Sequence, residues 1–354
     1  MDGRRVAGAG VQVGGVGRAV RVAFSSLIRL AHVLLLQRST KIITDKDGRG
    51  IVFFVGQPLC AHGGKWADVA KAAAETMASV REEGFIAAAL PPAFQSHRRG
   101  DFVAIAVGVS HGGGQTAPGT LVHAVERQAL INRLLADSAI KRIAGYQSSM
   151  CALSFYAPKL YAHFCHRLLW VYEHDNNLQR NFAESIFPAA SFNLGPSTVS
   201  LEHTDAGNVG YGLCALVALG EFDYRAGGHL VLFDLGLMVQ FPPGAVVLLP
   251  SGVLRHGNTP IQSNEERYSI AQYCAGGLLR WHRYGLRTAS AATKGAGKAK
   301  AKAIMGALNG KHDDRVREAL ALFSRVDELE TDRTTAFTNF HRFLTQPLPE
   351  DVKI

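Results

Sequence analysis

The chain has 354 residues and a formal net charge of +9, with 47% hydrophobic and 19% charged residues. This composition argues against a wholly disordered chain, and no apolar run reaches the ~18 residues of a membrane span, so we expect no membrane partner. Five scattered cysteines without a C-x-x-C pair argue against a zinc cluster or disulfide framework, while the positive charge favours a polyanionic partner such as nucleic acid.

Residues 1–39 are rich in Arg, Gly and Val and contain a single acid, Asp2. We interpret them as a basic, flexible extension. Arginines beside apolar residues are also typical of an organellar transit peptide, which would direct the protein to mitochondria. Without such a signal we expect the protein in the nucleus.

From residue 40 the pattern predicts a hairpin and then mostly helices. The first helix is expected to stop at Gly84, because glycine disfavours a helix interior. In chain order we expect strands at 41–43, 51–55 and 102–109, and helices at 66–81, 121–135 and 152–171.

A glycine-rich loop, Ser110-His111-Gly112-Gly113-Gly114-Gln115, follows the third of these strands. Glycines let the backbone approach a ligand closely, because no Cβ stands in the way. The loop is not a P-loop, since no Gly-Lys-Ser/Thr follows it. A plain turn explains the same composition.

The segment from 189 to 276 contains short β-rich runs separated by turns with Gly and Pro. Such a pattern is typical of a β-sandwich or barrel. The order H-x-D, Gly-Gly-x-Leu, Pro-Gly, His and Arg-x-Ser favours a double-stranded β-helix, or jelly roll, within an α+β fold. We expect its strands at about 189–194, 198–205, 211–219, 228–233, 237–241, 245–249 and 266–274.

The triplet His203-x-Asp205 is the centre of this half. Residues i and i+2 of a strand share a face, so His203 and Asp205 would project together. With His256 as third ligand they match the facial triad of non-haem Fe(II) oxygenases, which leaves positions open for a co-substrate and O2. The alternative is a structural His-Asp pair, because the chain has 14 histidines and a second H-x-D at 312–314, which we interpret as a solvated helix start.

Arg267 and Ser269 share a strand face in the same way. A guanidinium fork beside a hydroxyl is suited to bind a carboxylate, and we interpret the pair as the site of the distal carboxylate of 2-oxoglutarate. Asn193 is a candidate partner for the near end of the co-substrate. A buried Asn that caps a strand end is the other interpretation.

The last part of the chain is basic. Residues 288–311 lack acids and favour Ala, Gly and Lys, which predicts a flexible linker that attracts phosphate or only aids solubility. Residues 313–344 have a polar helical pattern. We therefore divide the chain into an extension at 1–39, a main domain at 40–286 with its β-helix core at about 189–276, and a linker with a C-terminal helix at 287–354.

Several of these motifs resemble those of known oxygenases. The 2-oxoglutarate/Fe(II) oxygenase superfamily is similar in Gly227-Gly228-x-Leu230, Pro243-Gly244, His256 with Pro260-Ile261, and Arg267-x-Ser269. Fungal members of the TET/JBP-like group resemble the chain in Ser191-Phe192-Asn193-Leu194-Gly195-Pro196, His203-x-Asp205-x-x-Asn208, Gly220-x-Phe222-Asp223, Gly227-Gly228-His229-Leu230, Phe241-Pro242-Pro243-Gly244, Ser251 with His256-x-Asn258, and Gln272-Tyr273-x-Ala275-Gly276-Gly277. Arg98-Arg99-Gly100 and the glycine-rich loop belong to the same resemblance, which covers about residues 40–285.

The resemblance implies Fe(II), 2-oxoglutarate and O2 as cofactors. It also implies oxidation of the 5-methyl group of a pyrimidine, 5-methylcytosine or thymine, in nucleic acid, so we expect methylated DNA as the partner of a monomeric enzyme. Such a base must be flipped out of the duplex into a pocket. Candidate substrate-binding residues are Asn208, Arg225, His229 and Gln115.

Two other functions stay open. The same chemistry could hydroxylate a protein or a small molecule, because a fold hosts many substrates. A basic nucleic-acid-binding protein with a vestigial metal site is the non-enzymatic alternative.

Overall fold

The computed structural model describes residues 11–15, 18–22, 32–34, 40–58, 65–149 and 151–345. The predictions of a flexible extension and of a transit peptide fall mostly on residues outside these ranges. Among the helices described, none is both long enough and apolar enough to cross a bilayer.

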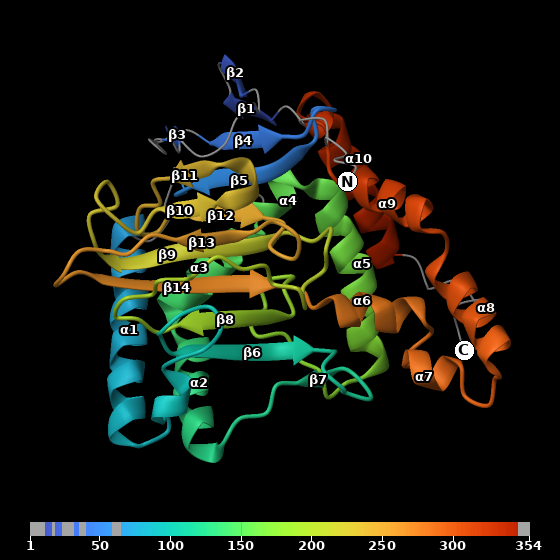
Figure 1. The fold of residues 1–354 in the computed structure, drawn as a ribbon, viewed down its shortest axis with the longest axis horizontal. Coiled ribbons are helices and arrows are strands. Elements are labelled where there is room, and N and C mark those ends of the chain that lie inside the picture. The colour runs from blue at the N-terminus through green and yellow to red at the C-terminus, as the bar shows by residue number, and fades with distance from the viewer. Residues whose placement is uncertain are drawn as a thin grey trace, which may run out of the picture.

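Two sheets form the β part of the fold (Figure 1). The large sheet has the order β2-β1-β4-β5-β12-β9-β14-β8-β6-β7, and the small one has the order β13-β10-β11-β3. The large sheet comprises β1 Val11–Gly15, β2 Arg18–Val22, β4 Lys41–Thr44, β5 Gly50–Gly56, β6 Ala104–Ser110, β7 Gly119–Thr120, β8 Ala189–Asn193, β9 Cys214–Glu221, β12 Val246–Leu249 and β14 Glu266–Tyr273. The small sheet comprises β3 His32–Leu34, β10 Leu230–Leu232, β11 Leu237–Val239 and β13 His256–Asn258.

Strand alternation gives the large sheet two apolar faces. In β12, Val247 and Leu249 join the cluster between the two sheets, while Val246 and Leu248 join the cluster beneath the helices. Leu230 and Leu232 of β10 complete the inner cluster from the small sheet. Two sheets packed through such a core, with helices on the outer face, confirm the predicted α+β jelly roll.

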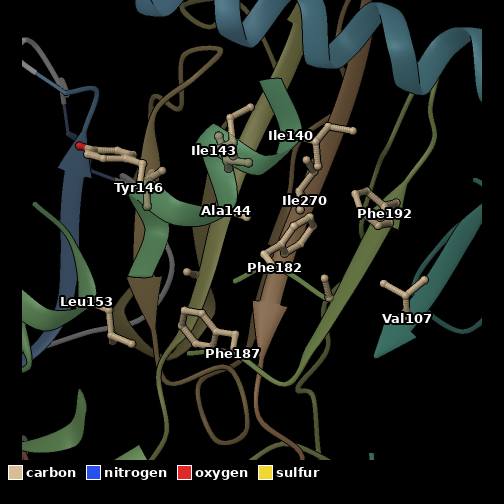
Figure 2. Close-up of a cluster of buried hydrophobic side chains, with 14 of the residues drawn as sticks. Val107, Ile140, Ile143, Ala144, Tyr146, Leu153, Phe182, Phe187, Phe192 and Ile270 are labelled. Carbon is tan, nitrogen blue, oxygen red and sulfur yellow. The ribbon is translucent and has the colours of Figure 1, made fainter. Parts of the chain in front are cut away.

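Helices cover the outer face of the large sheet. Figure 2 shows Ile140, Ile143 and Ala144 of α3 lying over Ile270 of β14 and near Phe192 of β8. Burying a large side chain such as Ile140 or Ile143 stabilises the fold by about 1.5–3 kcal/mol. The helices on this side are α1 Trp66–Ile86, α2 Val125–Ala136, α3 Ser138–Ser148, α4 Leu153–Tyr156 and α5 Pro158–His174.

The prediction that Gly84 ends the first helix was wrong, because α1 continues to Ile86. A Cβ on Gly84 would lie 2.4 Å from Cδ1 of Leu90, so the glycine serves close packing of the helix against the chain that follows. The helix predicted at 152–171 is divided into α4 and α5 before Pro158, which lacks a backbone N–H.

The strand predicted at 198–205 was also wrong. Within it, His203 makes a single bridge to His256 of the small sheet, and just before it Ser197 makes one to Arg267 of the large sheet. A turn follows directly, in which the Asn208 N–H donates to the Asp205 carbonyl at 2.8 Å. The three-residue strand β13 and the helix α3 were not predicted.

The stretch predicted as a flexible linker contains helices. The C-terminal elements are α6 Gly276–Arg283, α7 Ala289–Ala292, α8 Lys298–Asn309, α9 His312–Ala321 and α10 Leu329–Thr345. They lie along the edge of the molecule beyond α5 (Figure 1). The second H-x-D begins α9 with His312 exposed, as the interpretation of a solvated helix start predicted. Short 3-10 turns at Pro92–Phe94, Phe233–Leu235 and Val326–Glu328 complete the described elements.

Candidate active site

Three candidate metal ligands converge at one end of the jelly roll. Nε2 of His203 lies 3.7 Å from Oδ1 of Asp205, and Nε2 of His256 lies 4.0 Å from Oδ2 of the same carboxylate. One ligand atom from each residue lies within 4.8 Å of the others. Backbone pairing sets this geometry, because His203 and His256 exchange N–H···O bonds of 3.0 and 2.9 Å across a bridge.

The backbone also orients both imidazole rings. Nδ1 of His203 lies 2.7 Å from the Leu201 carbonyl oxygen, and Nδ1 of His256 lies 2.9 Å from that of Leu254. Each Nδ1 therefore donates to a carbonyl oxygen, which leaves each Nε2, on the side of Asp205, as the ring atom that can bind a metal. Burial and the neighbouring His256 ring lower the pKa of His203, which favours the neutral form that a metal ligand requires.

Asp205 is held by its own small network. Its N–H donates to the Ser251 carbonyl at 2.8 Å, and Asn208 Nδ2 lies 3.4 Å from its Oδ2. The same amide nitrogen donates to Ser251 Oγ at 3.1 Å. Such contacts orient a ligating carboxylate.

Arg267 lies within the jelly roll, and no acid in the described part of the chain forms an ion pair with it. It is 2% exposed, and one guanidinium nitrogen donates to Thr198 Oγ1 at 2.8 Å and to the Thr198 carbonyl at 3.2 Å. Its Nε has no partner among the described residues. Burial alone lowers the pKa of Arg267 to about 10. A charge desolvated without compensation is costly, so this guanidinium is poised to receive an anion.

Two neutral polar groups lie beside this guanidinium. Asn193 Nδ2 donates to Ser269 Oγ at 2.8 Å, because β8 and β14 place these residues directly opposite each other. Both are buried. Ser269 shares the inner face of β14 with Arg267, whereas Tyr268 and Ile270 point into the helix-side core.

One pocket joins the two groups, with an empty volume of about 520 Å³ that includes space open to solvent. The triad, Arg267, Ser269 and Asn193 all contribute to it. The complete lining is Arg99, Asn193, Ser200, His203, Asp205, Cys214, Leu216, Leu230, Leu249, Ser251, His256, Gly257, Asn258, Arg267, Ser269 and Ala271.

The four candidate substrate-binding residues do not line this pocket. Asn208 supports Asp205 instead, and Arg225 lies exposed on a turn with its guanidinium over the Tyr224 ring. Gln115 Oε1 accepts from the Gly112 N–H within the glycine-rich loop. His229 is buried, with Nδ1 3.2 Å from Thr259 Oγ1. Their substrate roles stay predictions.

Sequence reasoning gave no role to two residues that the structure brings into the site. Thr198 holds Arg267, but it fell in a predicted strand whose partners no local pattern indicates. Arg99 lines the pocket, and the only signal for it was the Arg98-Arg99-Gly100 motif. Arg98 donates to the Thr204 carbonyl, at 3.2 Å, between the first two ligands.

The residues present fit Fe(II) and 2-oxoglutarate. Two imidazoles and a carboxylate are the donor set of a non-haem iron site with open positions. The unpaired guanidinium matches the second carboxylate of the co-substrate, and it is reached through the same pocket.

Comparison with known proteins adds little. No protein-family model matches the sequence, and no curated protein matches it. Among solved structures, NgTET1 in complex with 5mC DNA shares 14% identity over 70% of this chain and 83% of that chain, with a TM-score of 0.39. A 2OG-Fe(II) oxygenase family oxidoreductase from Burkholderia pseudomallei shares 20% identity over 62% and 95%, with a TM-score of 0.27. The viral collagen prolyl hydroxylase vCPH from Paramecium Bursaria Chlorella virus-1 shares 15% identity over 24% and 57%, with a TM-score of 0.20. Because all three scores lie below 0.5, the function must be inferred from the chain's own site.

Proposed function

We propose that the protein is an Fe(II)- and 2-oxoglutarate-dependent dioxygenase. One observation carries the proposal: the same pocket is lined by the three candidate ligands and by a buried guanidinium that pairs with no acid among the described residues. A three-ligand group alone would serve many reactions, and a buried arginine alone would only cost stability. Together they accommodate a ligand with a metal-chelating 2-oxo acid at one end and a second carboxylate at the other.

Each residue then has a defined task. His203, Asp205 and His256 would hold Fe(II), and Arg267 with Ser269 would bind the distal carboxylate. When bound, iron and 2-oxoglutarate supply O2-dependent oxidation of a C–H bond to C–OH, with succinate and CO2 as products. Burial excludes water from Arg267, so its charge attracts the carboxylate more strongly than a solvated arginine would.

We further propose that the substrate is the 5-methyl group of a pyrimidine base in nucleic acid. The motif resemblance to the TET/JBP-like group supports this choice. Arg99 on the pocket wall and the exposed Arg98 beside the ligands would attract phosphates to the opening. We propose a nuclear location with this substrate, and a mitochondrial one if residues 1–39 act as a transit peptide.

The test is mass spectrometry of nucleosides after incubation of the full chain with Fe(II), 2-oxoglutarate and duplex DNA that contains 5-methylcytosine. We expect an oxidised base and a matching amount of succinate, and neither with Asp205→Ala. Absence of oxidised base, from protein shown to bind iron and 2-oxoglutarate, would refute the nucleic-acid substrate. Coupled turnover on a peptide or metabolite would then identify the protein or small-molecule hydroxylase.

A further inference from the structure

The segment that follows β14 is unusually basic. No Asp or Glu occurs between Arg267 and His312. Eight exposed cations lie in it, and we name them the C-terminal basic strip. They are Arg280, Arg283, Arg287, Lys294, Lys298, Lys300, Lys302 and Lys311.

The charge of the strip is not neutralised within the described part of the chain. None of its eight cations takes part in an ion pair there, and the next acids along the chain face other partners. Asp313 lies 3.4 Å from His312, and Asp314 lies 3.4 Å from Arg317. The strip thus contributes eight positive charges within one stretch of a chain whose net charge is +9.

The strip begins beside the candidate active site. The Gly276 N–H, at the start of α6, donates to the Gly207 carbonyl at 2.9 Å, and Ala275 bridges Asn208. Helix α6 carries Arg280 and Arg283, and a Cβ on Gly276 would lie 3.1 Å from Nη1 of Arg280, so this guanidinium lies near the start of the helix. At the far end, Tyr284 Oη donates to Asn309 Oδ1 at 2.8 Å and ties α8 to the end of α6.

Helix α8 is the most exposed part of the strip. None of its 12 residues is buried, and an isolated helix of that length is marginally stable in water. Lys298 and Lys302, four residues apart, repel each other on one face. A polyanion along α8 would remove that repulsion. At 1.5 Å per residue the helix is about 18 Å long, which matches about five phosphates of one strand.

We propose that the C-terminal basic strip binds the sugar–phosphate backbone of the nucleic acid whose base enters the pocket. This deepens the proposed function and rests on it. A membrane surface is a poorer fit, because membrane-bound basic helices expose an apolar face. None of the large exposed apolar side chains among the described residues belongs to 276–311.

The test compares two variants that each lose two charges. Lys298→Gln/Lys302→Gln alters α8, and the control Lys65→Gln/Lys141→Gln alters exposed lysines beside α1 and on α3. The full-length protein is titrated into a fluorescein-labelled duplex with 5-methylcytosine, from about 50 to 200 mM salt, and anisotropy is recorded. Binding to an RNA duplex of the same sequence and to vesicles of anionic lipid is measured in parallel.

We expect the α8 variant to bind either duplex about 10- to 50-fold more weakly at 0.1 M salt. The slope of log K against log salt should fall by about 2, at roughly 0.9 per lost phosphate contact. The control should bind like the wild type, and equal circular dichroism melting curves would show that all three proteins are folded.

Unchanged affinity and salt slope in the α8 variant would overturn the proposal, as would loss of vesicle binding with duplex binding intact. The test of the strip can fail or succeed independently of the test of the proposed function. Strip-dependent duplex binding without any oxidised base would support the strip and refute the substrate. Oxidised base with normal binding by the α8 variant would refute the strip alone.

Discussion

Replacing Arg267 with methionine should separate stability from co-substrate binding. Burial lowers the pKa of this guanidinium from 12.5 to about 10, and at about 1.4 kcal/mol per pH unit the charged form costs the folded protein roughly 3 kcal/mol. Methionine fills similar space without charge. The two bonds to Thr198 would be lost, at about 1 kcal/mol each. We therefore expect the free energy of unfolding of the ligand-free protein to rise by about 1 kcal/mol.

Binding of 2-oxoglutarate should respond in the opposite direction. Removing one partner of a buried, hydrogen-bonded charge pair costs about 2–5 kcal/mol. At about 1.4 kcal/mol per tenfold change, Kd would increase from roughly 30-fold to several-thousand-fold. A gain in stability together with a loss of 2-oxoglutarate affinity is expected only if the guanidinium binds an anion and does not stabilise the fold.

Isothermal titration calorimetry with Mn(II) in place of Fe(II) measures this Kd, and urea unfolding measures the stability. The matched control ligand is 2-oxovalerate, which has the same carbon chain but lacks the distal carboxylate. Its affinity should be the same for wild type and Arg267→Met. An unchanged Kd for 2-oxoglutarate would refute the role given to Arg267, and so would an equal loss for 2-oxovalerate.

Three further predictions concern the surroundings of the site. Asn208→Ala should weaken metal binding by about 10- to 100-fold in a chelator competition, because Asp205 loses its side-chain partner. Gly277→Ala should lower the melting temperature, because a Cβ there would lie 1.7 Å from the His111 carbonyl oxygen, and overpacking costs about 1–3 kcal/mol or more. The free energy of unfolding should decline as pH falls from about 6.5 toward 4. Burial lowers the pKa of His163 to about 4, so the unfolded chain takes up that proton first, and His163→Gln should flatten the decline.

For each of these three predictions, one result would contradict the reasoning. Wild-type metal affinity in Asn208→Ala would mean that the backbone bond from Asp205 to Ser251 is sufficient. A melting temperature unaffected by Gly277→Ala would show that the glycine-rich loop moves freely away from α6. A pH profile identical in wild type and His163→Gln would assign the acid sensitivity to other groups.

The sequence was enough to predict which residues form the candidate site, but not how far apart they lie. Alternation along β14 places Arg267 and Ser269 on one face, and this is a local property that the residue order predicts. That His256 meets His203 depends on a bridge between segments more than 50 residues apart. The sequence also could not show that Arg267 has no acidic partner within the described ranges, because this depends on every element that packs around the pocket.

The wrong predictions about the fold also arose from contacts between segments far apart in the chain. Gly84 was predicted to end a helix, but its contact with Leu90 comes from the chain turning back against α1. The segment 198–205 has strand-forming residues, yet its partners lie in two different sheets, so it forms only isolated bridges. Residues 288–311 were predicted as a linker from their composition, and the contact of Asn309 with Tyr284 helps to hold them as helices.

The sequence by itself determined the alternating faces of the strands, the H-x-D and Arg-x-Ser pairs and the concentration of positive charge after β14. These are properties of neighbouring residues, which covalent geometry relates directly. Only the tertiary structure decided that three ligands share one pocket with an unpaired guanidinium, and that the basic strip begins beside them. Those relations depend on the packing of sheets and helices, where segments far apart in the chain are brought together by the burial of apolar surface.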